Sequence, residues 1–133
     1  MSVFEWPVRV YWEDTDAGGV VYYANYLRFL ERCRTEWLRS RGIAQRELAA
    51  TRGVQFMVLG LSIEYRAAAR LDDSLVVTCA MTPEGRTTAV FDQKIWRAAG
   101  EREARELLIE AQVRVVCVDA KTLRPRRIGE YLS

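Results

Sequence analysis

The sequence predicts an α+β fold in which an antiparallel β-sheet of about five strands wraps around one long α-helix. The chain has 133 residues, a length typical of one domain, so we expect a single domain over residues 1–133. Residues 24–41 carry apolar side chains at three- and four-residue spacing, the pattern of an amphipathic helix. Most segments after residue 55 are rich in β-branched and large apolar residues and are separated by turn residues, the pattern of strands.

The first half of the chain supplies one strand and the long helix. Residues 8–12 read as the first strand, and the Asp and Gly residues of 14–19 favour a loop. The helix over 24–41 ends at Gly42, a residue type common just after helices. Its predicted apolar face consists of Leu27, Leu30, Cys33 or Arg34, Trp37 and Leu38.

The second half supplies the rest of the sheet. Residues 45–51 predict a short second helix that ends near Gly53. Strands are predicted over 56–65, 74–81, 87–96 and 107–118, with turns at 72–73, 83–85 and 98–101. One helix covers one face of such a sheet, so the other face meets solvent or a second subunit.

Composition and charge exclude several classes of protein. The net charge is +2 and the basic residues are spread along the chain, which argues against nucleic acid as a partner. No apolar run approaches 18 residues, so we expect no membrane span, and the first residues lack the pattern of a signal peptide. Cys33, Cys79 and Cys117 are far apart and odd in number, which predicts reduced thiols, a cytoplasmic location and no metal site.

The chain contains no histidine. Every Ser-His or Cys-His mechanism and every histidine metal site is therefore excluded, unless a partner supplies the residue. We expect no cofactor.

The most informative segment is 13–26, where acidic residues and two adjacent glycines directly precede the long helix. A helix start has unpaired N–H groups and a partial positive charge, and glycines let another molecule approach the backbone. A carboxylate beside such donors suits attack on a polarised carbonyl. Taken alone, Asp14 and Asp16 are better explained by loop formation and helix capping, and we expect Asp14 to be mainly structural.

Four stretches carry a family resemblance that spans nearly the whole chain. They are residues 11–22 (YWEDTDAGGVVY), 24–36 (ANYLRFLERCRTE), 63–73 (IEYRAAARLDD), and 115–119 (VVCVD) followed by 124–128 (RPRRI). With these motifs the chain resembles the hotdog-fold acyl-CoA thioesterases. The most similar group includes 4-hydroxybenzoyl-CoA thioesterase and the Tol-Pal-associated acyl-CoA thioesterases of Gram-negative bacteria.

The resemblance implies hydrolysis of acyl-CoA thioesters to free acid and CoA. Asp16 would be the nucleophile or general base, and the backbone N–H of Tyr23 would polarise the thioester carbonyl. Many Tol-Pal-associated members carry His at the Tyr23 position, whereas the 4-hydroxybenzoyl-CoA enzymes carry Tyr. The residues expected to bind substrate are Gly19, Val20, Val21, Tyr22, Asn25, Leu59 and Gly60.

Coenzyme A carries phosphates, which require cations at the mouth of the site. The candidates are Arg86, Lys94 and the cluster of Lys121, Arg124, Arg126 and Arg127. The resemblance also implies a homo-oligomer, either a dimer or a tetramer, whose sites use residues of two subunits. The segment 56–61 is apolar and suits such an interface.

Two other functions fit a hotdog fold. A hotdog dehydratase would need a catalytic His, which this chain lacks. A non-catalytic acyl-CoA-binding or scaffold protein would keep the fold without turnover. An intact Asp16 element favours the thioesterase, and the Tyr23 departure leaves the binding protein as the alternative.

Overall fold

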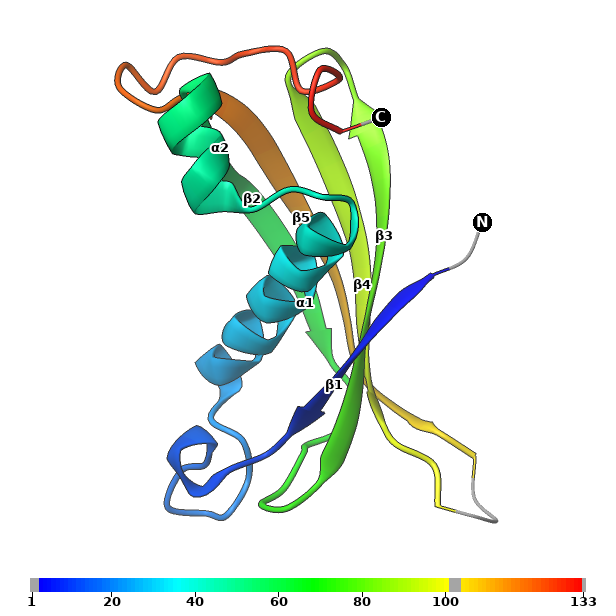
Figure 1. Ribbon diagram of the computed structural model, residues 1–133. Coiled ribbons are helices and arrows are strands. Elements are labelled where there is room, and N and C mark those ends of the chain that lie inside the picture. The colour runs from blue at the N-terminus through cyan, green and yellow to red at the C-terminus, as the bar shows by residue number, and fades with distance from the viewer. Residues whose placement is uncertain (1–2, 101–103, 133) are drawn as a thin grey trace.

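In the computed structural model, which describes residues 3–100 and 104–132, one long helix lies across one face of a curved antiparallel sheet (Figure 1). The sheet order is β1-β3-β4-β5-β2. This confirms the predicted α+β class. The strands are β1 (Phe4–Arg9), β2 (Val54–Tyr65), β3 (Ser74–Glu84), β4 (Thr88–Arg97) and β5 (Glu106–Asp119), and the helices are α1 (Tyr26–Ser40) and α2 (Gln45–Arg52).

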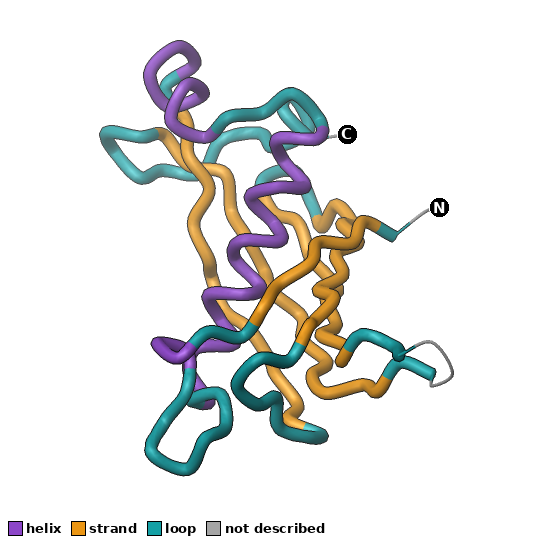
Figure 2. Tube along the Cα trace, turned by 60° about the horizontal axis from the view of Figure 1, so that its bottom comes forward, coloured by secondary structure: helices purple, strands orange, loops and turns teal. Residues whose placement is uncertain are grey.

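The apolar face of α1 forms the centre of the core. The helix runs along the concave side of the sheet (Figure 2), where it meets β1, β3 and β4. Phe29 and Leu30 are fully buried there, together with Phe91 of β4. Leu27, predicted to face the core, is 37 % exposed, because Tyr26 and Phe29 face the core in the first turn; the rest of the predicted face is buried as expected. The buried stripe of α1 consists of Tyr26, Phe29, Leu30, Cys33, Trp37 and Leu38.

The predicted first strand is displaced toward the N-terminus. The strand covers Phe4–Arg9 rather than residues 8–12, and Trp12–Asp14 forms a 3-10 turn. The turn forms because the Asp14 carboxylate accepts a hydrogen bond from the Tyr11 N–H, at 2.8 Å, which pulls the chain out of the extended conformation. Pro7 is tolerated within β1 because β1 is an edge strand.

The predicted turn at 83–85 also begins too early. Pro83 and Glu84 belong to β3, where Pro83 pairs with Ala89 of β4. β1 pairs with β3 only as far as Cys79, so no strand lies on that side of β3 at Pro83. Proline has no backbone N–H to donate, and it is tolerated at such a strand edge. Asp72 adopts a positive φ of 71° and forms the predicted turn before β3. The predicted turn at 98–101 lies partly outside the described residues.

The free edge at β2 is apolar. A bulge between Val58 and Gly60 leaves Leu59 without a partner residue on β5. Exposed apolar side chains on this strand are Met57, Val58, Leu59, Leu61 and Tyr65. An apolar strand edge of this kind is open to pairing with another strand. Within the described residues, no helix is both long and apolar enough to cross a bilayer.

The central position of Phe29 leads to a stability prediction. Replacing Phe29 with Ala leaves a cavity between α1 and the sheet and should lower the free energy of unfolding by about 3–5 kcal/mol. Urea denaturation measures this loss. Arg28→Ala, on the exposed face of the same helix, serves as the control, and an equal loss in both variants would contradict this account of the core.

Candidate active site

The predicted catalytic carboxylate lies in a tight loop directly before α1. Thr15 and Val21 form an antiparallel bridge that closes this loop. Within it, the Asp16 N–H donates to the Val20 carbonyl at 2.9 Å, and the Gly19 N–H donates to the Asp16 carbonyl at 3.0 Å. These bonds fix the backbone of Asp16, while its side chain remains exposed.

The two adjacent glycines have different roles in the loop. Gly19 has a φ of +79°, the left-handed conformation that closes a three-residue hairpin loop. Gly18 has no such φ, but its N–H donates to Asp16 Oδ1 at 2.8 Å. A Cβ on Gly18 would come within 3.2 Å of that oxygen. Gly19 therefore shapes the turn, and Gly18 lets the backbone approach the carboxylate closely.

The start of the long helix presents free backbone donors. A 3-10 turn, Tyr23–Asn25, leads directly into α1, and neither segment has a side-chain N-cap. In the part of the chain that the structure describes, the N–H groups of Tyr23 and Ala24 donate to no protein acceptor. Such groups, at the positive end of a fifteen-residue helix, suit an oxygen that gains negative charge.

Asp14 connects the loop to the helix start. Its carbonyl accepts from the Tyr22 N–H at 3.0 Å, and its Oδ1 accepts from Asn25 Nδ2 at 2.9 Å. Both side chains are buried, with 6 % of Asp14 and 8 % of Asn25 exposed. The amide of Asn25, predicted to bind substrate, is thus engaged by a carboxylate of the protein.

Four tyrosines surround the helix start. The rings of Tyr22 and Tyr23 lie 5.0 Å apart, and Tyr65 packs against both Tyr23 and Tyr26. The Tyr65 hydroxyl donates to the Tyr23 carbonyl at 3.1 Å, and the Tyr26 hydroxyl accepts from the Ala69 N–H at 3.0 Å. Burial raises the pKa of both Tyr26 and Tyr65, so neither phenol is a proton acceptor near neutral pH.

The other predicted substrate-binding residues fall into two places. Val20 and Val21 lie at the end of the Asp16 loop, where Val20 bridges to Arg70 and the Val21 N–H donates to the Ala69 carbonyl at 2.8 Å. Leu59 and Gly60 lie at the bulge in β2, five or more residues before Tyr65. Within one subunit this separation corresponds to roughly 15 Å from the aromatic cluster.

A cavity of about 170 Å³ lies between α1 and β2, farther along the helix. Its apolar wall includes Phe56, Val58 and Phe91, and its polar wall includes Glu31 and Arg34. The Arg34 guanidinium donates to Gln93 Oε1 at 3.0 Å, and burial lowers the pKa of Arg34.

Two of the predicted phosphate-binding cations share one pocket at the far end of the sheet. Arg86, in the β3–β4 turn, and Arg127 both line it, and the Ile128 N–H donates to the Arg86 carbonyl at 2.9 Å. Arg126 instead forms an ion pair with Asp119 at 3.1 Å. Arg124 and Lys121 are exposed in the same C-terminal loop.

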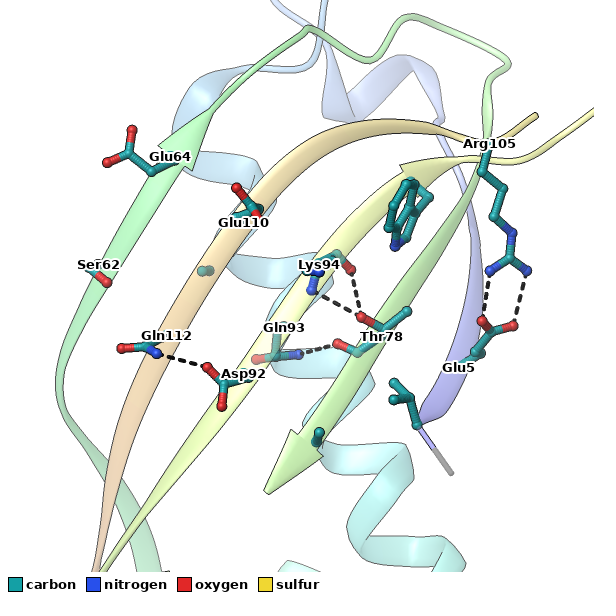
Figure 3. Close-up of a pocket in the computed structure, with 14 residues that line it drawn as sticks. Glu5, Ser62, Glu64, Thr78, Asp92, Gln93, Lys94, Arg105, Glu110 and Gln112 are labelled. Atoms are coloured by element: carbon teal, nitrogen blue, oxygen red, sulfur yellow. Dashed lines mark hydrogen bonds and ion pairs between the residues drawn. The ribbon is translucent and has the colours of Figure 1, made fainter. Parts of the chain in front are cut away.

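Lys94 is separate from these cations. It lies on the outer face of β4, in an open pocket of about 600 Å³ that Figure 3 shows from the side away from α1. Glu5, Asp92 and Glu110 share this pocket with Lys94 and Arg105. With these carboxylates nearby, the outer face is a poor place for phosphates.

Sequence reasoning missed Tyr65 and the contact between Asp14 and Asn25. Tyr65 lies 42 residues from its partner Tyr23, and no spacing rule in the sequence links them. Asp14 and Asn25 are 11 residues apart, on either side of a loop, so their contact depends on how that loop folds back.

Comparison with known proteins places these features in a family. Residues 18–104 match the model of the thioesterase superfamily. The acyl-CoA thioester hydrolase YbgC of Escherichia coli O157:H7 is 49 % identical over 131 residues, covering 98 % of this chain and 93 % of that protein. The acyl-CoA thioesterase YbgC of Haemophilus influenzae is 43 % identical over 122 residues, covering 92 % of this chain and 85 % of that protein.

A solved structure shares the fold. The 4-hydroxybenzoyl-CoA thioesterase from Pseudomonas sp. strain CBS-3 superposes with a TM-score of 0.87, covering 98 % of this chain and 96 % of that one. The two sequences are 21 % identical, so this likeness concerns the fold alone. The sheet wrapped around one helix is the predicted hotdog fold.

The left-handed conformation of Gly19 leads to a second stability prediction. A side chain at this φ is strained, so Gly19→Ala should lower the free energy of unfolding by about 1–2 kcal/mol, as measured by urea denaturation. Nothing lies within 4 Å of the added methyl group, so the loss would come from the backbone alone. Gly129→Ala, equally uncrowded and without a positive φ, is the control and should change little.

Proposed function

Because the chain belongs to the thioesterase superfamily, we propose that it is an acyl-CoA thioesterase that hydrolyses acyl-CoA thioesters to free acid and CoA. The observation that carries this proposal is the exposed Asp16 carboxylate in a fixed loop, close in sequence to the unpaired N–H groups of Tyr23 and Ala24. The two curated relatives described above are named for the same activity.

We propose that the Tyr23 N–H polarises the thioester carbonyl. The helix start stabilises the negative charge that grows on the carbonyl oxygen during attack. Asp16 then either attacks the carbonyl carbon, which gives a mixed anhydride that water hydrolyses, or removes a proton from an attacking water. A thiolate is a good leaving group, so a carboxylate suffices and no histidine is required.

We propose that the acyl group extends along α1. The cavity between α1 and β2 begins at Glu31, about two helical turns from Tyr23. Its volume of about 170 Å³ is close to that of cavities that hold one aromatic ring. Aromatic and short aliphatic acyl groups therefore fit a single subunit better than long chains do.

We propose that two subunits pair along their β2 edges. The exposed apolar residues of β2 would then be covered, and the unpaired edge of the sheet would be completed. A tetramer would add a second contact between such dimers.

We propose a cytoplasmic location, because the three cysteines are free and buried, and burial helps raise the pKa of the Cys79 and Cys117 thiols.

Antiparallel pairing of the two β2 strands would also complete the substrate site. In one subunit, the loop of Asp16 lies at the Ser74 end of β3, where Val20 bridges to Arg70. Arg86 and Arg127 lie beside Pro83 at the other end of β3, and Figure 1 shows the loop before α1 and the β3–β4 turn at opposite ends of the sheet. The length of β3 corresponds to roughly 30 Å.

The Val54 end of β2 lies near the C-terminal loop that carries the cations, and the Tyr65 end lies near Tyr23. In an antiparallel pair of β2 strands, the Val54 end of the partner strand lies beside the Tyr65 end of the first, so the partner's cations come closer to Asp16. We propose that these cations bind the CoA phosphates across the interface.

The role of Asp16 is tested by the Asp16→Asn variant. An amide keeps an oxygen to accept the Gly18 N–H but is neither a nucleophile nor a base, so kcat should fall at least about 10²-fold. The measurement is steady-state hydrolysis of a panel from acetyl-CoA to palmitoyl-CoA, with benzoyl-CoA and 4-hydroxybenzoyl-CoA. Glu13→Gln, an exposed acid in the same segment, is the matched control. Near-normal turnover by Asp16→Asn would refute the role, and CoA binding without turnover by the unaltered chain would favour the binding protein.

The shared site is tested by complementation between two impaired variants, assayed at an acyl-CoA concentration well below the raised KM. Arg127→Glu should raise KM for acyl-CoA more than for a short thioester without the nucleotide, because only CoA carries the phosphates. Coexpression of Arg127→Glu with Asp16→Asn should restore activity, since a mixed dimer contains one site with both native residues. Lys94→Glu, on the outer face, is the control that should leave KM unchanged. Failure of the mixture to regain activity, with mixed dimers demonstrated, would mean that the site lies within one subunit.

A further inference from the structure

We propose that Asp14 and Asn25 form a buried clamp that positions the Asp16 carboxylate against the Tyr23 N–H. The inference rests on the proposed thioesterase function and assigns both residues as positioning residues. Neither side chain needs to touch the substrate: the clamp acts by fixing the loop that carries Asp16 relative to the helix start.

The contacts of Asp14 span both parts of the site. Its Oδ2 accepts from the Tyr11 N–H at 2.8 Å and its carbonyl accepts from the Tyr22 N–H at 3.0 Å. Its Oδ1 accepts from Asn25 Nδ2 at 2.9 Å. Asp14 is therefore bonded to Tyr11, which follows β1, and to Tyr22 and Asn25, which lie on either side of Tyr23.

The same anchor lies two residues before Asp16. The Thr15–Val21 bridge and the bond from the Asp16 N–H to the Val20 carbonyl transmit the position of Asp14 to the catalytic loop. The Asn25 N–H also donates to the Tyr22 carbonyl at 2.8 Å, which closes the turn that contains Tyr23. A shift of the clamp would therefore move Asp16 relative to the Tyr23 N–H.

The chemistry of the clamp explains the choice of residues. A carboxylate that is 6 % exposed needs donors, and it has two, from Tyr11 and Asn25. Asn25 is 8 % exposed, and in the described residues its side-chain oxygen accepts no hydrogen bond from the protein. The Asn25 amide can therefore rotate and present its oxygen to position 14 if that residue becomes a donor.

Because the Asn25 amide can rotate, substitutions at the two ends of the same hydrogen bond should have opposite effects on kcat. Asn25→Asp places two carboxylates in contact, which forces the clamp apart, so kcat should fall about 10²-fold with KM nearly unchanged. Asp14→Asn keeps an acceptor for Tyr11 and gains a donor for a rotated Asn25, so kcat should stay within about fivefold of the unaltered chain. The double variant Asp14→Asn with Asn25→Asp restores a donor and an acceptor, and its kcat should recover.

The measurements are kcat and KM with the acyl-CoA ester that the unaltered chain hydrolyses fastest, together with thermal unfolding of every variant. Thr78→Val removes a side-chain acceptor for the Lys94 N–H in the sheet and controls for a general loss of stability. If Asn25→Asp does not fold, Asn25→Ala replaces it, because it removes the donor without adding a charge. The same loss of kcat is expected there.

The outcomes separate this inference from the proposed function. If the unaltered chain hydrolyses no acyl-CoA ester, the thioesterase function fails and the positioning role fails with it. If it hydrolyses them, a folded Asn25→Asp variant with native kcat overturns the clamp alone. A double variant that is folded but as slow as Asn25→Asp also overturns it. A loss of kcat in Asp14→Asn equal to that in Asp16→Asn would instead make Asp14 a catalytic carboxylate.

Discussion

The concave face of a curved, five-stranded sheet has to be covered, and α1 covers its centre. This constraint fixes much of the molecule. The buried stripe of α1 must face β1, β3 and β4, which fixes the rotation of the helix about its axis. Because α1 has only fifteen residues and packs on β1, β3 and β4, it leaves β2, at the opposite edge of the sheet, partly uncovered. The apolar, bulged β2 edge is the physical consequence, and this exposed edge is the basis of the proposed pairing of subunits.

The site depends on the same helix, because its first turn has to be anchored where the chain enters the core. Asp14 supplies that anchor from the loop before the helix, while no side-chain cap occupies the first N–H groups. The arrangement leaves the donors of Tyr23 and Ala24 free at the positive end of the helix dipole. Neither acid caps the helix: Asp14 is buried and anchors the loop to the helix start, and the Asp16 side chain remains exposed.

A chain without histidine has few ways to hydrolyse an ester, and an exposed carboxylate in the loop before a helix start is one that suits a thioester. Membership of the thioesterase superfamily and the relatives at 49 % and 43 % identity agree with that chemistry. The Tyr at position 23 does not weaken it, since the role asked of this residue is that of a backbone donor. The Tyr65 hydroxyl donates to the Tyr23 carbonyl, which helps to fix the peptide between Tyr23 and Ala24.

The sequence by itself determined the fold class, the long helix, the second helix with its Gly53 end and the succession of strands along the chain, because periodicity and turn residues are local properties. It also located the loop of Asp16, because the glycines it needs are adjacent in the chain. The tertiary structure decided that the first strand ends at Arg9 and that β3 includes Pro83, since both depend on which strand lies alongside. It also decided that Tyr65 supports Tyr23, that Asn25 belongs to Asp14, and that Lys94 lies away from Arg86 and Arg127. These are contacts between residues whose separation in the chain bears no relation to their distance in space, so only the packing of the helix on the sheet could fix them.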